Sequence, residues 1–366
     1  MKIIGSVRED LSREKRISIT PETVKRFVDL NFSVFLENNY GKHLGIDDEE
    51  YKNQGASLNS SAKVVLEKSE IILKVNFPSS DEVGLIKNKS VLIGQFDPLA
   101  NKEIINKLIK KEVKIFSLNL LPRITRAQSM DVLSSQANLA GYRAVIESIE
   151  EFGKAIPMMM TAAGTITPAK VMVIGAGVAG LQAIATAKRL GAIVCATDVR
   201  SAAKEQVESL GGKFLTVESS ENLETVEGYA KEAGEDFKKK QAELIRDAVK
   251  KNDIIICTAL IPGKKAPRII TEDMVKSMKP GSLIYDLAVV QGGNSAFSEA
   301  DKVKVVNDIK IMGSKNILNS LAVTASSLYA KNLFNFVNNL YSKDKKDIYI
   351  NKEDEIINKT LIDKEL

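Results

Sequence analysis

The chain has 366 residues, of which 44% are hydrophobic and 27% charged, and its formal net charge at pH 7 is +5. This length suits two domains, and the composition is ordinary for a soluble globular protein rather than a disordered or membrane-spanning one. The small charge comes from lysines spread along the chain and disfavours nucleic acid as a partner, while the separated Cys195 and Cys257 favour neither a disulfide framework nor a zinc site.

Strand and helix patterns alternate through the first third of the chain. Helical spacing of apolar residues predicts helices over 21–31 and 101–111, the first with Thr20 as its N-cap and Pro21 at its first position. Short apolar runs predict strands at 2–6, 33–36, 71–75, 91–94 and 113–116. This alternation is typical of an α/β domain.

A second alternating series follows a long helical pattern at 132–152, which we interpret as a connector between domains. A further helix at 319–341 is expected to pack back on the first domain. Later segments predict strands at 171–174, 193–197, 254–258, 282–287 and 348–350, and a helix at 178–190. The predicted fold is α/β, with two Rossmann-like domains of doubly wound parallel sheets joined by long helices. The expected domains are 1–133 with 320–366, and 134–319.

A glycine-rich turn, Gly175 to Gly180, directly follows an apolar strand and opens a helix, which is the pattern of a dinucleotide site. The free N–H groups and positive dipole end of that helix suit a pyrophosphate. Asp198 ends the next strand, eighteen residues beyond Gly180. Its carboxylate favours ribose hydroxyls over a 2′-phosphate, hence NAD(H) over NADP(H), although Arg200 could serve NADP(H). The predicted site residues are Gly175, Ala176, Gly177, Val178, Ala179, Gly180, Asp198, Val199 and Arg200.

Histidine, the usual proton acceptor of nicotinamide-dependent dehydrogenases, is almost absent. The single histidine, His43, falls in a predicted loop and is expected to be an ordinary surface or structural residue. Hydride transfer between two nicotinamides needs no proton acceptor, so it fits a dinucleotide-binding enzyme of this composition. Lysine and aspartate also act as bases, so composition leaves other reactions open.

Long motifs at 122–145, 157–164, 181–191, 204–214 and 259–264 cover much of the chain, the first reading PRITRAQSMDVLSSQANLAGYRAV. They resemble the NAD(H)-binding domain I of proton-translocating NAD(P) transhydrogenase. The resemblance implies the separate soluble alpha subunit of the three-polypeptide bacterial form, present as a homodimer. It further implies an NADP(H)-binding beta subunit and a membrane-spanning subunit as partners, and a cytoplasmic location at the inner face of the membrane.

The resemblance also implies roles for four residues of the first motif. Arg123 and Asp131 would grip the nicotinamide carboxamide and the neighbouring ribose or phosphate, and Ser134 would hydrogen-bond the carboxamide. Gln128 would face the second nucleotide, carried by the partner subunit. Arg123, Gln128 and Asp131 are therefore the catalytic candidates. In the alternative interpretation, Arg123 and Asp131 form an ion pair at a helix start and Gln128 is polar surface.

Three further segments complete the site that the resemblance implies. A polar stretch between 218 and 234 has no clear period, and its Gly228 and Tyr229 match a mobile loop that covers bound NAD(H). Ala259 and Leu260 begin another of the motifs. Gln291, in Gln-Gly-Gly-Asn, matches a turn near the nicotinamide pocket. The alternatives are a plain βα turn at Gln291 and an exposed loop tyrosine at Tyr229.

We therefore expect direct hydride transfer between NADH and NADP⁺ on a partner subunit, coupled to proton translocation by membrane subunits. One alternative is an alanine dehydrogenase-like enzyme, whose substrate-holding residues match Arg16 and Lys74. That enzyme carries a catalytic histidine where this chain reads Gly-Gln-Phe-Asp-Pro at 94–98, and an aspartate where it has Val290. Arg16 and Lys74 are then expected to be structural relics. The other alternative is a non-catalytic module that senses NAD(H).

Overall fold

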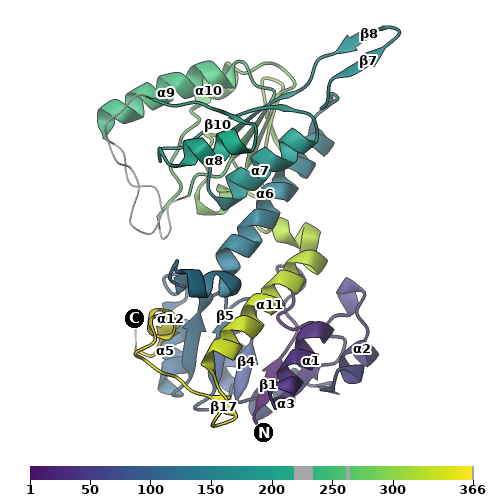
Figure 1. Cartoon of the computed structure of the whole chain (residues 1–366), viewed down its shortest axis with the longest axis vertical. Helices are drawn as coiled ribbons and strands as arrows, with labels where there is room; N and C mark the ends of the chain where they lie inside the picture. The colour runs from purple at the N-terminus through teal and green to yellow at the C-terminus, as the bar shows by residue number, and fades with distance from the viewer. Residues whose placement is uncertain (218–233, 261–263, 365–366) are drawn as a thin grey trace. The chain divides into compact units, whose positions relative to one another are not determined.

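The computed structural model describes residues 1–217, 234–260 and 264–364 (Figure 1). The chain divides into two compact units: unit 1 is Met1–Gln136 with Leu318–Leu366, and unit 2 is Ala137–Ile317. The expected domain limits, 133 and 320, lie three and two residues from these division points. Helix α6, Val132–Glu151, carries the chain from unit 1 into unit 2.

Unit 1 contains a seven-stranded sheet in the order β18-β6-β5-β4-β1-β2-β3. The strands are β1 Ile3–Ser6, β2 Ser33–Glu37, β3 Ala56–Asn59, β4 Ile71–Leu73, β5 Val91–Gly94, β6 Lys114–Ser117 and β18 Leu361–Ile362. Strands β1 to β6 pair in parallel, whereas β18 pairs antiparallel with β6. The central position of β1 beside β4 creates the point where the strand order reverses, at which open α/β sheets hold their ligands.

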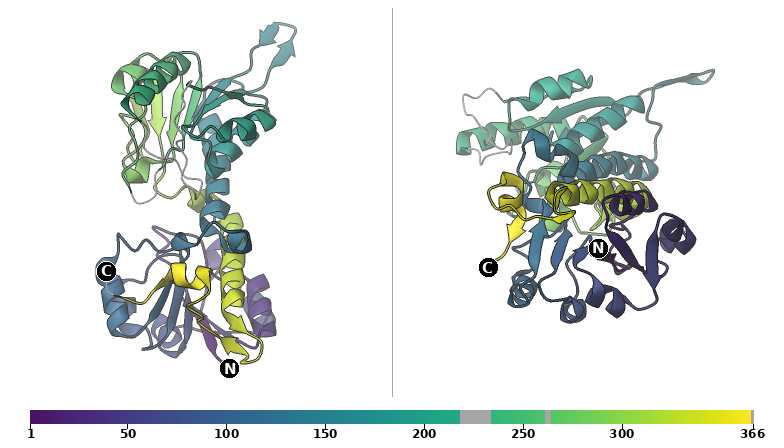
Figure 2. Two further views of the ribbon diagram at one scale, coloured as in Figure 1. Left: turned by 60° about the vertical axis from the view of Figure 1, so that its left-hand side comes forward. Right: turned by 60° about the horizontal axis from the view of Figure 1, so that its bottom comes forward.

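Helices cover both faces of this sheet (Figures 1 and 2). Helix α1, Pro21–Asp29, and helix α11, Ala322–Leu340, pack on one face through Phe27, Leu333 and Phe336. Helices α3 Ala62–Lys68, α4 Ser80–Leu85 and α5 Lys102–Lys110 cover the other face, while α2 Asp48–Asn53 and α12 Glu355–Thr360 lie beside β3 and β6. The predicted N-cap of α1 is confirmed, because Thr20 accepts a hydrogen bond from the backbone N–H of Thr23.

Unit 2 repeats this arrangement in its own seven-stranded sheet, in the order β11-β10-β9-β12-β13-β15-β14. Its strands are β9 Lys170–Ile174, β10 Ile193–Thr197, β11 Lys213–Phe214, β12 Ile254–Cys257, β13 Leu283–Asp286, β14 Lys304–Val306 and β15 Ile309–Met312. All pairings are parallel except that of β14 with β15. Helices α7 Val178–Arg189 and α8 Ala203–Ser209 lie on one face, and α9 Glu235–Val249 and α10 Glu272–Lys276 on the other. A hairpin of β7 Met159–Thr161 and β8 Gly164–Ile166 projects from the unit.

The structure confirms the predicted α/β class and two doubly wound sheets, with corrections at the edges. Each sheet ends in an antiparallel strand that the sequence patterns did not predict, and they also missed the strands β3, β11 and β15 and the helix α9. The helix expected at 319–341 begins as a 3₁₀ segment, Ile317–Leu321, and becomes α11 only at Ala322. The strand expected at 348–350 is β17, Asp347–Ile348, which pairs with β16, Tyr341–Ser342.

Three smaller expectations concern single residues and membrane spans. Both cysteines fall in apolar, strand-like runs that favour burial, but only Cys257 is buried and Cys195 is half-buried. His43 lies in an exposed 3₁₀ turn, where its Nε2 is 2.7 Å from the carbonyl oxygen of Lys15. Within the described ranges, no helix is both long enough and apolar enough to cross a bilayer.

Candidate functional site

The turn between β9 and α7 has the geometry that a dinucleotide site requires. Gly175 has a φ of +93°, which a residue with a side chain rarely adopts. A Cβ on Gly180 would lie 1.9 Å from the carbonyl oxygen of Gly175, so only glycine lets helix and strand approach this closely. A Cβ on Gly177 would meet nothing within 4 Å, which leaves open space over the backbone. The three glycines therefore have the turn, access and packing roles of the dinucleotide fingerprint.

Two neighbouring elements hold this turn in place. The hydroxyl of Thr258, directly after β12, donates to the carbonyl oxygen of Gly175 at 2.8 Å. On α6, a Cβ on Gly141 would lie 2.0 Å from the carbonyl oxygen of Ala179, so that helix also packs closely on the start of α7. Gly177 is the N-cap of α7 and makes no side-chain capping bond. The first N–H groups of α7 thus begin a positive helix end suited to an anion.

Asp198 follows β10 and points back to the glycine turn. Its Oδ2 accepts a hydrogen bond from the backbone N–H of Ala176 at 2.7 Å. Its other contacts come from Arg200, through the backbone N–H, Nε and Nη2, each at 2.9 Å. The predicted residues Gly175 to Gly180, Asp198 and Arg200 are therefore brought together at the carboxyl ends of β9 and β10, and the half-buried Val199 lies between the last two.

The loops after β12 and β13 meet through two polar residues. Asn294 accepts a hydrogen bond from the N–H of Ala259 at 3.1 Å and donates to the carbonyl oxygen of Ala259 at 2.9 Å. The fully buried Asp286 accepts from the N–H groups of Asn294 and Ala288, at 2.7 and 2.9 Å. These bonds fix the Gln-Gly-Gly-Asn turn, whose Gln291 is exposed.

The four predicted residues of the first family motif lie in unit 1. Arg123 and Gln128 are exposed, the latter in the 3₁₀ segment Thr125–Met130. Asp131 precedes α6, and its Oδ1 accepts a hydrogen bond from the N–H of Ser134 at 2.9 Å. The Ser134 hydroxyl donates to Oδ2 of the same carboxylate. Asp131 thus caps the start of α6 and fixes Ser134 beside it.

Other predicted residues border or lie outside the described ranges. Gly228 and Tyr229 fall within 218–233, outside the residues that the structure describes. Leu260 is the last described residue before 261–263 and is 40% exposed. Val290, which replaces the expected acid, is 63% exposed.

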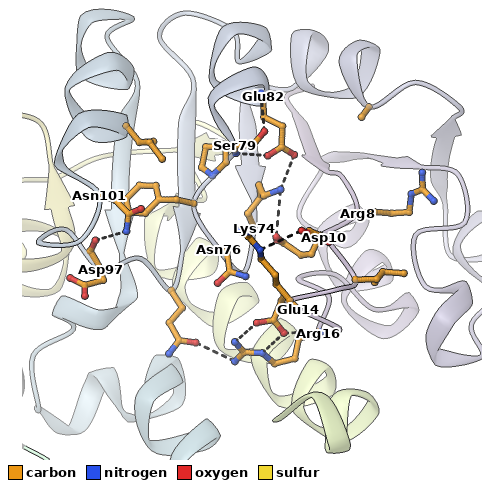
Figure 3. A pocket seen from close by; sticks show the side chains of 18 of the residues that line it. Arg8, Asp10, Glu14, Arg16, Lys74, Asn76, Ser79, Glu82, Asp97 and Asn101 are labelled. Carbon is orange, nitrogen blue, oxygen red and sulfur yellow. Dashed lines mark hydrogen bonds and ion pairs between the residues drawn. The ribbon is translucent and has the colours of Figure 1, made fainter. Parts of the chain in front are cut away.

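A separate pocket of about 860 Å³ lies in unit 1, at the carboxyl ends of β1, β4 and β5 (Figure 3). Lys74 is 2% exposed in its side chain, and its Nζ lies 2.9 Å from Glu82 and 3.6 Å from Glu9. Arg16 donates to both oxygens of Glu14, through Nε at 2.9 Å and Nη2 at 2.8 Å. The four cations that line the pocket, Arg8, Arg13, Arg16 and Lys74, each have a carboxylate partner.

Electrostatics inside this pocket shift several groups. Burial raises the pKa of Glu9 to about 7, although Lys74 opposes the rise. The pKa of Arg16 is raised because its bonds and charge attraction to Glu14 outweigh the opposing effect of burial, and that of Lys74 is raised similarly by Glu9 and Glu82. Both cations therefore stay protonated at neutral pH, held by carboxylates of the chain itself.

Sequence reasoning missed Thr258 and Asp286, which set the shape of the glycine-turn site in unit 2, and it placed Asn294 in the Gln-Gly-Gly-Asn turn without giving it a role. An aspartate closing the apolar run Leu-Ile-Tyr at 283–285 was a usable signal, because a buried carboxylate needs several donors. No local pattern marks Thr258, whose partner is 83 residues away, and the partner of Asn294 is 35 residues away, beyond the reach of its own motif.

Comparisons with known proteins agree with this architecture. Residues 5–140 match the model "Alanine dehydrogenase/PNT, N-terminal domain", and residues 144–365 match its C-terminal counterpart. The chain is 51% identical to the first part of the NAD(P) transhydrogenase subunit alpha of Rhodospirillum rubrum, covering 98% of this chain and 95% of the relative. A transhydrogenase structure from Sinorhizobium meliloti superposes with a TM-score of 0.89 at 45% identity, covering 98% of both chains. An alanine dehydrogenase of Methanococcus maripaludis is 30% identical, over 80% of this chain and 73% of that protein.

Two doubly wound units, one carrying a fingerprint glycine turn, define a member of the alanine dehydrogenase/PNT family, and the chain belongs to that family. Within it, the chain belongs with the NAD(P) transhydrogenase alpha subunits, as its sequence motifs predicted.

Proposed function

We propose that this chain is the NAD(H)-binding component of a proton-translocating NAD(P) transhydrogenase. The observation that carries the proposal is the glycine turn of unit 2, with open space over Gly177 and the Asp198 carboxylate bonded to Ala176 at its edge. This arrangement lies where the strand order of the sheet reverses, between β9 and β12, which is the usual dinucleotide position.

The glycine turn and the loops beside it each suit a different part of NADH. The N–H groups at the start of α7 would receive the pyrophosphate, and Asp198 would accept hydrogen bonds from the adenosine ribose. Ala259, Leu260 and Gln291, on the loops after β12 and β13, would border the nicotinamide half. Gly228 and Tyr229 would cover the bound nucleotide and exclude water.

Arg123, Gln128, Asp131 and Ser134 would position the nicotinamide for transfer. Bound NADH supplies the hydride, and NADP⁺ on the partner subunit receives it, so no proton moves and no base is required. Most of the acceleration would come from placement, because two rings held at roughly 3–3.5 Å react as one bound pair. The bond from the Ser134 N–H to Asp131 supports this role, because it fixes the two residues relative to each other.

The proposal includes partners and a location. The chain would act as a homodimer with an NADP(H)-binding beta subunit and a membrane-spanning subunit, which couple hydride transfer to proton translocation. It would then sit at the inner, cytoplasmic face of the membrane, peripherally, through those subunits. The existence of partner subunits is supported by relatives that are named alpha subunits of a transhydrogenase.

Hydride transfer is best followed with an NADP⁺ analogue whose reduced form absorbs at a different wavelength from NADH. We expect reduction only when the matching NADP(H)-binding subunit is present. Gln128→Ala should slow transfer severalfold or more with nearly unchanged NADH affinity, because this exposed side chain would face the partner nucleotide. Equal loss of rate and affinity would contradict the partner-facing role, and no transfer with the partner would overturn the proposal.

An alanine dehydrogenase-like activity is the second candidate, favoured by a 30%-identical relative and by Arg16 and Lys74 in the unit 1 pocket. The pairing of both cations with carboxylates of the chain argues against it. NADH oxidation by pyruvate and ammonia without any partner subunit would support it. Binding of NADH with neither activity would instead favour a sensing module.

A further inference from the structure

The carboxylate of Asp198 accepts four hydrogen bonds from groups of the chain itself. Its Oδ1 accepts from the backbone N–H and the Nε of Arg200, both at 2.9 Å. Its Oδ2 accepts from the N–H of Ala176 at 2.7 Å and from Nη2 of Arg200 at 2.9 Å. A carboxylate offers about four acceptor positions, so two ribose hydroxyls cannot bind without replacing existing donors.

The four donors differ in how easily they can leave. The N–H groups of Ala176 and Arg200 belong to the backbone of the glycine turn and of the segment after β10, so losing them would deform the site. The guanidinium of Arg200 is on a rotatable side chain that is 16% exposed, and it covers a carboxylate that is 7% exposed. The side chain of Arg200 is therefore the group that a ribose would displace.

Resting on the function proposed above, we propose that Arg200 is a displaceable internal competitor for Asp198 and thereby sets both the affinity and the selectivity of the adenosine-ribose subsite. NADH binding exchanges two charge-assisted bonds from Arg200 for two from ribose hydroxyls, so a share of the binding free energy is spent on the exchange. Without the guanidinium, only water has to leave the carboxylate.

The same residue reduces discrimination against NADPH. A 2′-phosphate cannot donate a hydrogen bond to Asp198 and would face its negative charge. The displaced guanidinium would stay close enough to neutralise some of that repulsion, since it begins only two residues away. Removing the guanidinium should therefore tighten NADH and weaken NADPH, which is the opposite of what a simple structural support would do.

The test is titration of the whole chain with NADH and with NADPH, followed by nicotinamide fluorescence, for wild type, Arg200→Gln and Arg200→Lys. We expect Arg200→Gln to bind NADH about three- to tenfold more tightly and NADPH more weakly. Arg200→Lys should fall between, because an ammonium lacks the two-pronged contact. Lys204→Gln is the matched control, since it removes one positive charge from the exposed start of α8.

Each result decides the proposal. Weaker or unchanged NADH binding by Arg200→Gln, with normal thermal unfolding, would overturn it and make Arg200 a support of the site. If Arg200→Gln unfolds early, Arg200→Lys serves in its place, and failure of that variant to tighten NADH would overturn the proposal equally. No NADH binding by wild type would instead be a failure of the proposed function.

Discussion

The two units of this chain share one sheet topology, but the segment that follows the first strand differs between them. Each sheet has six parallel strands in the chain order 3-2-1-4-5-6 and an antiparallel seventh strand at one edge. In unit 2 the first strand leads through three residues, 175–177, into α7. In unit 1 the first strand is followed by fourteen residues, 7–20, before α1 begins. The crevice is therefore a property of the topology, and the segment after the first strand decides its chemistry.

The segments after the first strand differ in the groups they present as well as in length. The short turn of unit 2 presents backbone N–H groups and space over Gly177. The long segment of unit 1 brings Glu9, Glu14 and Arg16 into a pocket in which each lining cation meets a carboxylate. Charges are paired in both crevices, since Asp198 and Arg200 of unit 2 also bond each other, so the difference is that unit 2 adds the backbone N–H groups at the start of α7.

The largest effect should come from breaking the unit 1 charge cluster. Lys74→Met leaves the buried Glu9 side chain and the half-buried Glu82 without their shared cation, which should cost about 4 kcal/mol of unfolding free energy. Hydrogen exchange should show the loss at the amides of β1 and β4, with β9 and β12 unaffected. The exposed Lys63→Met, on α3, is the control. If Lys74→Met were as stable as wild type, the charges of this cluster would not stabilise one another.

A smaller loss should follow from filling the close contact in unit 2. Gly180→Ala puts a methyl group 1.9 Å from a backbone oxygen, so it should cost about 3 kcal/mol and remove measurable NADH binding. Gly177→Ala, three residues earlier, meets open space and should change stability by less than about 0.5 kcal/mol while still weakening NADH. Denaturant unfolding and NADH titration of both variants separate the two roles. Equal stabilities would contradict the packing role of Gly180.

The next effect in size should be a pH dependence of stability that arises in unit 1. Burial raises the pKa of Glu9 in the folded chain to about 7, above its ordinary value of 4.5, so folding favours the protonated form. That contribution is fully present below pH 4.5 and is lost as the pH rises through 7. At about 1.4 kcal/mol per pKa unit, the loss amounts to at most about 3 kcal/mol.

Glu9→Gln should abolish this component of the pH dependence, because an amide keeps the acceptor for the N–H of Val75 but does not titrate. Urea unfolding midpoints between pH 4.5 and 8 should fall less steeply for this variant than for Glu67→Gln, an exposed control on α3. Parallel curves for both variants would show that Glu9 titrates normally.

Local signals predicted much of this architecture, although they missed the helix α9, and the missed edge strands depend on non-local pairing. The strand, glycine turn and helix from β9 to α7 follow from adjacent residues, as does the Thr20 cap of α1. The edge strands β14 and β18 have three and two residues, too few to show a period, and their pairing depends on distant partners. Motif residues Arg123, Gln128, Asp131 and Ser134 came from family resemblance, since no local pattern assigns a nicotinamide contact.

The pairing of Asp198 with Arg200 was within reach of sequence reasoning, because the two residues are neighbours after one strand. The sequence showed both a ribose acceptor and a cation near it, and these pointed to different cofactors. Only the structure shows that the cation is directed at the acceptor itself. Long-range supports such as Asp286 and Asn294 depend on the order of strands, which a single sequence does not reveal.

The smallest expected effect tests whether unit 2 depends on such long-range support. Thr258→Val keeps the shape of the side chain but removes the hydroxyl that bonds the carbonyl oxygen of Gly175, which should cost about 1 kcal/mol. The turn would then be held less firmly, so NADH affinity should fall by a few-fold while unit 1 is unchanged. Thr216→Val, at an exposed position, is the control for the substitution itself. If Thr258→Val bound NADH as wild type does, the turn would be self-sufficient, and the difference between the units would depend on the length of the segment after the first strand alone.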